Sequence, residues 1–359
     1  MADLPTDSWT EILARLPAKS LMRLRCVCKS WCSLIDSSDF IVTHLHIYNK
    51  KRKYLIEVER YKSNIRSIDT FTKIDVLFEA LGEHAILGSS YGLYLLKNVF
   101  HDIFVSLYNP CIRKSFVIPP SPFSHEQTIL YRLGFAPSSN DYKLLTIGCF
   151  KFPEFSIAVY SLNDNLWRIK GRFHDHIRGL LLYKDEGEIY FKGAMYWLGF
   201  DQGSATHLIW FDFDSEEFNL VDLPDALKQT CLTKMCFVLG ESIAVFGMSS
   251  DRTCIWVLVE DGGDKSWRLW YTGDVNLEAL QFLTGSNYSI GLTGIVNEEK
   301  NTLLVQHSVN DYFYGMCSYN FKSHQIQHLD FYNCRPKSID TYVETLVLHK
   351  QHQRGRFDN

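Results

Sequence analysis

Two different periodicities divide the hydrophobic positions of this chain. In the first forty residues, apolar side chains recur every three or four positions, which is typical of amphipathic helices. The clearest stripe consists of Trp9, Ile12, Leu13 and Leu16. Pro17 is expected to end that helix, since proline disrupts a helix interior. Similar spacing continues over residues 18–35, so the segment predicts three short helices.

These helices carry more large apolar side chains than forty residues can bury among themselves, because a small unit hides little of its surface. Part of the apolar face is therefore expected to pack on something else. Two partners fit: the domain that follows in the chain, or a groove on another protein that receives helices. The periodicity does not decide between them.

Beyond residue 45 the pattern changes to short apolar strands separated by glycine, asparagine, aspartate and serine. One hairpin recurs, in which an aromatic-rich strand, a polar turn and a strand with an apolar residue follow one another. Those apolar residues are Phe116, Trp167, Phe218, Trp267 and Ile326, at intervals of 51, 51, 49 and 59 residues. A period near 50 residues is typical of kelch repeats, and four-stranded units of this kind form the blades of a propeller.

The repeat predicts a mainly β protein in which a small α domain precedes a kelch-like β-propeller of six blades. Counting back one period from Phe116 reaches Ile65, so a degenerate sixth copy is expected there. The apolar run over residues 341–348 has no hairpin partner after it and is expected to complete an early blade. The predicted domains are residues 1–42, residues 43–349 and a disordered tail over residues 350–359.

Composition and charge narrow the functional classes. Hydrophobic residues make up 46% of the 359 residues, enough for a sizeable core, and the formal net charge is −4. A weakly acidic chain gives no basis for nucleic-acid or membrane-surface binding. No apolar run approaches the ~18 residues of a membrane span, and no secretory signal is visible. The ten cysteines lack the tight spacing of a disulfide framework, so reduced thiols and a cytoplasmic or nuclear location are expected.

The helical segment resembles a plant F-box. The matching runs are residues 4–7 (LPTD), 11–21 (EILARLPAKSL) and 23–31 (RLRCVCKSW). Trp9 and Leu24 depart from the Leu and Phe common in that family but keep the stripe apolar. The resemblance implies docking on a Skp-type adaptor, which links to a cullin and a RING protein. The implied adaptor contacts are Leu4, Pro5, Ile12, Leu13, Leu16, Leu21, Val27 and Trp31. Some of these must instead hold the helices together, and the sequence cannot divide the set.

The remaining chain resembles the F-box-associated domain of plant F-box proteins. The matching runs include residues 133–135 (LGF), 140–144 (NDYKL), 159–167 (VYSLNDNLW) and 192–197 (KGAMYW). The combined resemblance implies the substrate-recognition subunit of an SCF-type (Skp–cullin–F-box) ubiquitin ligase, whose propeller captures a protein target. The run 342–346 (YVETL) and the overall length are similar to the S-locus F-box group. That likeness implies a role in self-incompatibility, with a pistil ribonuclease as the target.

Motifs for catalysis and metal binding are sparse. The triplet His174-Asp175-His176 lacks a further ligand set at a matching spacing. Cys26, Cys28 and Cys32 are expected to be small core residues, because no paired set stands nearby at zinc spacing. No nucleophile elbow, phosphate-binding glycine loop or zinc-protease motif is present. The sequence therefore predicts a non-catalytic protein without a cofactor or a metal.

Two alternatives stay open at this point. The propeller could be an enzyme or a stand-alone interaction domain whose F-box only controls the protein's own turnover, because fold alone does not decide function.

Target recognition is expected on one rim of the propeller, where loops project. The candidate loops span residues 119–131, 149–155, 173–179 and 225–233, with an ordinary connecting turn as the alternative for each.

Overall fold

A computed structural model describes most of the chain. The described residues are 6–49, 54–58, 61–67, 72–79, 84–98, 100, 104–123, 127–151, 154–172, 188–201, 204–231, 233–274, 292–297, 301–308, 314–329, 338–341 and 343–348. Two compact units make up the molecule. Unit 1 holds residues 1–125, 131–133 and 341–359, and unit 2 holds residues 126–130 and 134–340.

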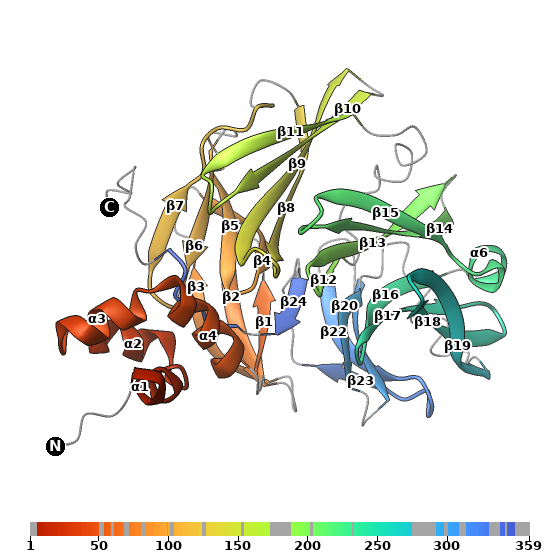
Figure 1. Cartoon of the computed structure of the whole chain (residues 1–359). Helices are drawn as coiled ribbons and strands as arrows, with labels where there is room; N and C mark the ends of the chain where they lie inside the picture. The colour runs from red at the N-terminus through yellow and green to blue at the C-terminus, as the bar shows by residue number, and fades with distance from the viewer. Residues whose placement is uncertain are drawn as a thin grey trace. The chain divides into compact units, whose positions relative to one another are not determined.

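Helices gather at the N-terminal end of unit 1 (Figure 1). They are α1 (Thr6–Leu13), α2 (Ala18–Leu24), α3 (Lys29–Ile35) and α4 (Ser38–Tyr48). Pro17 is the N-cap residue of α2, which explains the break after α1. The first three helices confirm the predicted three-helix segment. The fourth helix is an addition that crosses the expected boundary at residue 42, and the Ser37 hydroxyl caps it by accepting from the Phe40 amide at 3.2 Å.

One apolar core holds the four helices together. Its buried members are Leu13, Ala14, Ala18, Leu21, Ile35, Phe40 and Leu346. Arg25 adds a two-point contact with Asp36, whose carboxylate oxygens accept at 2.5 and 2.8 Å. This pair joins the residue after α2 to the residue after α3, so it fixes the angle between those helices.

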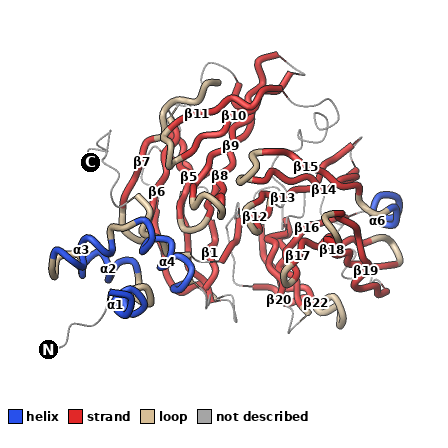
Figure 2. Tube along the Cα trace, viewed as in Figure 1, coloured by secondary structure: helices blue, strands red, loops and turns tan. Residues whose placement is uncertain are grey.

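Strands dominate the rest of the described chain, as Figure 2 shows by colour. In unit 1 they are β1 (Tyr54–Val58), β2 (Lys62–Ser67), β3 (Lys73–Glu79), β4 (His84–Ser90), β5 (Leu93–Asn98), β6 (Val105–Asn109) and β7 (Lys114–Val117). Further along lie β8 (Gln127–Ala136), β9 (Asp141–Lys151), β10 (Glu154–Ser161), β11 (Leu166–Arg172), β12 (Ile189–Phe191), β13 (Ala194–Asp201), β14 (Ser204–Asp212) and β15 (Glu217–Asp222). The last are β16 (Thr233–Leu239), β17 (Ser242–Met248), β18 (Arg252–Asp261), β19 (Asp264–Asp274), β20 (Leu292–Asn297), β21 (Thr302–Ser308), β22 (Tyr314–Asn320), β23 (Ile326–Leu329) and β24 (Ser338–Thr341).

The described strands form six four-stranded sheets. Five of them take their strands in chain order, as β4 to β7, β8 to β11, β12 to β15, β16 to β19 and β20 to β23. The remaining sheet has the order β24-β1-β2-β3. This arrangement confirms the predicted mainly β fold with six blades. The strand that completes the early sheet is β24, which ends at Thr341; residues 343–348 are not strand, so the expected closing strand lay several residues too late.

A tight turn recurs in front of the last strand of the sheets. In five sheets the residue just before that strand, or two before it, adopts positive φ: Arg113 (54°), Asn165 (55°), Glu216 (57°), Gly263 (96°) and His324 (59°). The side chain that opens the turn often binds the backbone inside it, as when Asp212 accepts from the amides of Asp214 and Ser215 at 2.8 Å each. Asp212 therefore binds the backbone of its own turn.

The recurring apolar residues lie where the repeat predicts for five blades. Each stands in the last strand of its sheet: Phe116 in β7, Trp167 in β11, Phe218 in β15, Trp267 in β19 and Ile326 in β23. Ile65 lies in β2, the third strand of its sheet, and not in the last strand, β3. The sixth blade exists, but the expected copy is displaced by one strand, because β24 supplies the first strand from the far end of the chain.

Large side chains from neighbouring sheets fill the cores of unit 2. Buried members of one cluster include Phe211 and Phe213, whose rings meet at 5.1 Å. Another cluster centres on Phe237, Phe246 and Tyr319. One predicted loop is helical: α6 (Asp225–Thr230) packs Leu227 into that second core, so residues 225–233 are not an irregular loop throughout. Among the described residues, no helix is long and apolar enough to cross a membrane.

Candidate functional site: the outer face of the F-box segment

Two large apolar side chains stand exposed on the N-terminal helices. Ile12 in α1 is 48% exposed, and Val27, in the turn between α2 and α3, is 61% exposed. Single exposed apolar residues are ordinary on a protein surface. Here, however, both belong to the set that the sequence assigns to adaptor contacts, and covering them would remove apolar area from water.

The structure divides the rest of the predicted set. Leu13 and Leu21 are fully buried in the helical core, so in this chain they hold the helices together. Leu16 and Trp31 are half-buried and pack against the same core, leaving part of each side chain accessible. Leu4 and Pro5 lie outside the described residues. The accessible part of the predicted surface is therefore Ile12, Leu16, Val27 and Trp31.

Aromatic contact stiffens this surface from beneath. The rings of Trp9 and Trp31 meet at 5.1 Å between centroids with an angle of 59° between their planes. Such a tilted arrangement is favourable for aromatic pairs. It links α1 to α3, so Trp9, which departs from the usual F-box residue, supports the position of a predicted contact residue.

The cysteines of this segment do not form the expected small core. Cys26 and Cys28 are free thiols and exposed, and Cys32 is half-buried. Cys26 and Cys28 lie in the turn between α2 and α3, where the chain runs on the surface, whereas Cys32 lies within α3. A hydrogen bond with the Ser30 hydroxyl lowers the pKa of the Cys28 thiol. Among the described residues no group of three or more His, Cys, Asp or Glu side chains could hold a metal ion, and His174 to His176 lie outside them.

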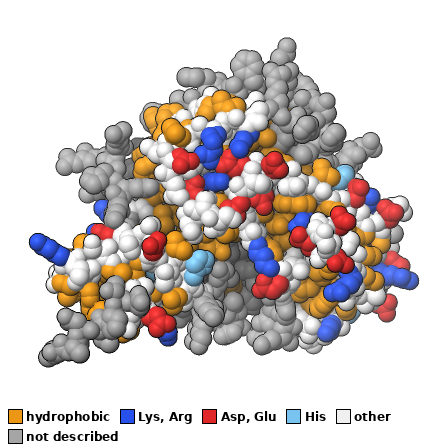
Figure 3. All heavy atoms as spheres, in the orientation of Figure 1, with side chains coloured by type: hydrophobic (Ala, Val, Ile, Leu, Met, Phe, Trp, Pro, Cys, Tyr) orange, Lys and Arg blue, Asp and Glu red, His pale blue; other side chains and the backbone are white. Residues whose placement is uncertain are grey.

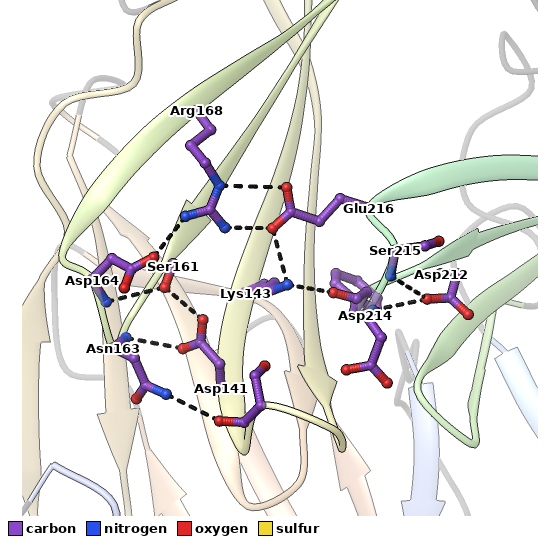
Figure 4. A network of polar contacts seen from close by, with 12 residues as sticks. Asp141, Lys143, Ser161, Asn163, Asp164, Arg168, Asp212, Asp214, Ser215 and Glu216 are labelled. Carbon is purple, nitrogen blue, oxygen red and sulfur yellow. Dashed lines mark hydrogen bonds and ion pairs between the residues drawn. The ribbon is translucent and has the colours of Figure 1, made fainter.

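A second polar cluster lies in unit 2 and joins two sheets (Figure 4). Glu216, in the turn before β15, is paired with Lys143 of β9 at 2.9 Å, with Lys170 of β11 at 2.6 Å and with Arg168 of β11. The Lys143 ammonium also donates to the Phe213 carbonyl at 2.6 Å. Charged side chains of both signs gather over β9 to β11 in the surface view (Figure 3). Sequence reasoning missed this cluster, because its cations lie 46 to 73 positions before Glu216 in the sequence.

The electrostatics of this cluster argue against acid–base chemistry. Burial alone would raise the pKa of Glu216, but hydrogen bonds from Arg168, Lys170 and Lys143 outweigh it and lower the pKa to about 2. A carboxylate that stays ionised at every physiological pH does not exchange protons with a substrate. The cluster is therefore a structural joint between the sheets β8–β11 and β12–β15.

Comparison with known proteins decides the family. A family model described as the F-box associated beta propeller domain matches residues 44–348, and an F-box domain model matches residues 1–43. The chain belongs to the F-box proteins that carry an F-box-associated β-propeller. The helices α1 to α4 thus form its F-box and the following segment, and the six sheets are the blades.

Relatives in Arabidopsis thaliana match this chain over most of their length. F-box protein CPR1 is 26% identical, with 85% of this chain and 82% of that protein covered. The F-box/kelch-repeat protein At3g23880 is 27% identical over 74% of this chain and 78% of that protein. A third relative, the F-box/LRR-repeat/kelch-repeat protein At2g27520, is 31% identical over 67% of this chain and 66% of its own length.

The F-box contacts one end of the blade β4–β7. Neighbouring strands of this blade run antiparallel, so the turns at Tyr91-Gly92 and at Pro110 to Arg113 lie at the same end of the sheet. The connection between β5 and β6 lies at the opposite end. Cys111 and Ile112, in the turn between β6 and β7, pack against the F-box core. Phe100 and Phe104, in the connection at the opposite end, are exposed. This F-box protein therefore keeps its F-box and two exposed phenylalanines at opposite ends of one blade.

Proposed function

We propose that this F-box protein is the substrate-recognition subunit of an SCF-type ubiquitin ligase. The F-box docks on a Skp-type adaptor, and the propeller holds a protein target for ubiquitination. The observation that carries the proposal is the exposure of Ile12 and Val27 on a segment that matches the F-box domain and whose other large apolar side chains are buried or half-buried. A partner that covers these two side chains would remove their apolar area from water.

Adaptor docking follows from ordinary burial energetics. A fully covered Ile or Val side chain contributes about 1.5–3 kcal/mol, and roughly half of each is exposed before binding. The half-buried Leu16 and Trp31 extend the apolar area, while Arg15, Lys19, Arg23 and Lys29 are exposed. The adaptor surface that fits is an apolar groove with acidic residues at its rim.

Target capture is proposed for the end of the blade β4–β7 that lies opposite the F-box, where Phe100 and Phe104 are exposed. Of the predicted loops, residues 119–123 follow β7 at this end of the blade, whereas residues 127–131 belong to β8. In unit 2, residues 149–151 and 154–155 belong to β9 and β10 and are not loop. Exposed aromatic side chains contribute strongly to protein interfaces, because they bury a large area with few rotatable bonds. The segment 173–179 lies outside the described residues.

Reconstitution tests this function. The purified chain is mixed with a Skp-type adaptor, a cullin and a RING protein, and ubiquitin transfer is followed by mass spectrometry. We expect ubiquitin chains that depend on the F-box protein and that are lost with Ile12→Ser and Val27→Ser together. Ubiquitin transfer that is independent of the chain, or a complex that never assembles, would overturn the proposal.

The same proposal makes the chain a non-catalytic subunit. Stoichiometric transition metal in the purified protein, together with turnover of a small molecule, would instead favour the propeller enzyme. A cytoplasmic or nuclear location is part of the proposal and is testable by imaging a fluorescent fusion. Recognition of a pistil ribonuclease in self-incompatibility stays a prediction from the S-locus resemblance, and affinity capture from pistil extract would test it.

A further inference from the structure

The segment Val343–Leu348, called here the C-terminal strap, lies against both the F-box and the blade β4–β7 within unit 1. It follows β24 and is neither helix nor strand. More than 290 positions separate it in the sequence from the F-box residues that it contacts. Val343, Thr345, Leu346 and Leu348 are buried, so the strap is an integral part of unit 1 and not a loose tail.

On the F-box side the strap supplies a missing helix cap. The residue before α2 is Pro17, and no side chain from the N-cap position binds the first turn. The Glu344 carboxylate accepts instead from the Ala18 amide at 2.7 Å. A negative charge at this end of a helix is favourable, because unpaired N–H groups point toward it. Glu344 thus caps the N-terminus of α2 from a distant position in the sequence, whereas a Ser or Asp at the N-cap position does so in other helices.

Asn49, directly after α4, forms a second polar link with the same residue. Its side-chain oxygen accepts from the Glu344 amide at 2.9 Å, and its side-chain nitrogen donates to the Glu344 carbonyl at 2.9 Å. The nitrogen also donates to the Leu45 carbonyl at 2.8 Å, which fixes the side chain against α4. One asparagine therefore binds both backbone groups of Glu344.

Leu346 completes the apolar core of the F-box. It is fully buried there with Leu13, Leu21 and Phe40. A leucine from outside the F-box is thus a full member of its core. Removing a buried leucine side chain leaves a cavity and weakens the packing around it, so the helices depend on a residue more than 300 positions away in the sequence for part of their core.

The blade side holds the strap by its backbone. The Asn109 side-chain nitrogen, at the end of β6, donates to the carbonyls of Thr345 and Val347 at 2.8 and 2.9 Å. At the turn between β4 and β5, Gly92 has φ of 82°, and a Cβ atom there would lie 2.6 Å from the Val343 carbonyl oxygen. The strap therefore passes so close to this turn that only glycine leaves room.

We infer that the C-terminal strap locks the F-box onto the blade β4–β7, with Glu344 as the residue that positions α2. The F-box faces the strap with its inner side and leaves Ile12 and Val27 exposed, so locking and adaptor docking use different surfaces. This inference rests on the proposed function in one respect: in a ligase, the lock would fix the orientation of the docked adaptor relative to the blade β4–β7. The lock itself is a property of the chain alone.

Hydrogen–deuterium exchange of the full chain at single-residue resolution tests the lock. The Ala18 amide should exchange at least about 10-fold faster in Glu344→Ala than in the wild type, while the Cys32 amide, bonded to the Cys28 carbonyl within the F-box, keeps its rate. Glu344→Gln keeps an oxygen acceptor and should restore slow exchange at Ala18. Unchanged exchange at Ala18 in Glu344→Ala, or no rescue by Gln, would overturn the inference.

A pair of glycine substitutions tests the blade side. Gly92→Ala should speed exchange at Ala18, because a methyl group there displaces the strap at Val343. Gly262→Ala is the matched control, since Gly262 also has positive φ (60°) but its added methyl group would meet no described atom within 4 Å. Equal exchange at Ala18 in both variants would count against the lock. If Gly92→Ala does not fold, as judged by thermal unfolding, the Glu344 variants alone decide.

Adaptor binding separates this inference from the proposed function. The Glu344→Ala variant should bind a Skp-type adaptor within about twofold of the wild type, but in a reconstituted ligase ubiquitin should spread over more lysines of the blades. The same lysine pattern in both proteins would remove the ligase part of the inference. Failure of the wild type to bind any adaptor would refute the proposed function and leave the exchange result to judge the lock.

Discussion

The buried carboxylate of Glu216 allows a quantitative prediction about the joint between two blades. Its side chain is only 6% exposed and meets three cations, of which Lys143 is equally buried. The pKa falls from 4.5 in the unfolded chain to about 2 in the folded protein. Each pKa unit corresponds to about 1.4 kcal/mol, which gives roughly 3 kcal/mol. Because Arg168 and Lys170 are partly exposed and screened by water, we expect about 2 kcal/mol.

The perturbation is Glu216→Gln, which keeps the size of the side chain and removes its charge. Urea unfolding at pH 7 should show a loss of about 2 kcal/mol, because Lys143 stays buried without its ionic partner. The matched control is Glu241→Gln: Glu241 also pairs with a lysine, Lys192 at 2.7 Å, but its side chain is 86% exposed. Water screens such an exposed pair, so Glu241→Gln should change the free energy of unfolding far less than Glu216→Gln does.

The pH dependence gives the same prediction a sign. Glu216 has a lowered pKa when folded, so its contribution is complete above pH 4.5 and is lost as the pH falls toward 2. The difference between wild type and Glu216→Gln should therefore shrink over that range. A difference that stays constant with pH, or equals the small effect of Glu241→Gln, would refute the electrostatic account of the joint.

Two further predictions concern the F-box. Burial lowers the pKa of His44, which contacts the Leu16 carbonyl at 2.9 Å. The unfolded chain therefore takes up a proton more readily than the folded protein, and the free energy of unfolding should fall as the pH drops below about 6.5. His44→Phe should remove that part of the pH dependence in urea unfolding, and an unchanged dependence would contradict the prediction. Cys28 has a lowered thiol pKa, so it should react quickly with iodoacetamide. Because Cys28 is next to Val27, a Skp-type adaptor at saturating concentration should slow this labelling severalfold. An undiminished labelling rate in the complex would contradict docking at Val27.

Local patterns in the sequence predicted the first three helices and most of the blades, but not α4 or α6. The spacing from Trp9 to Leu16 predicted the first helix, and the apolar residue of each last strand predicted the blade period, because helix and hairpin signals extend over only a few positions. The sixth blade was displaced at Ile65 because its first strand, β24, comes from the other end of the chain. A period cannot reveal an exchange of this kind.

The functional surface was only half predictable for a related reason. The helical stripe identifies apolar positions, but Ile12 and Leu13 belong to the same stripe, and only the packing of α1 on the other helices exposes one and buries the other. Glu344 carries no local signal at all, since its role depends on Ala18 and Asn49, which lie about 300 positions away. Contacts of that separation leave no mark in a single sequence.

The central claim, that the outer face of the F-box docks on an adaptor, is tested most directly by calorimetry with a purified Skp-type adaptor. Ile12→Ala and Val27→Ala together remove exposed apolar area that contributes about 2 kcal/mol on binding, which corresponds to a roughly 30-fold higher Kd. Ile169→Ala, on the exposed side of β11, is the control and should leave the Kd unchanged. Equal affinity of the double variant and the wild type, with all three proteins folded, would contradict the account.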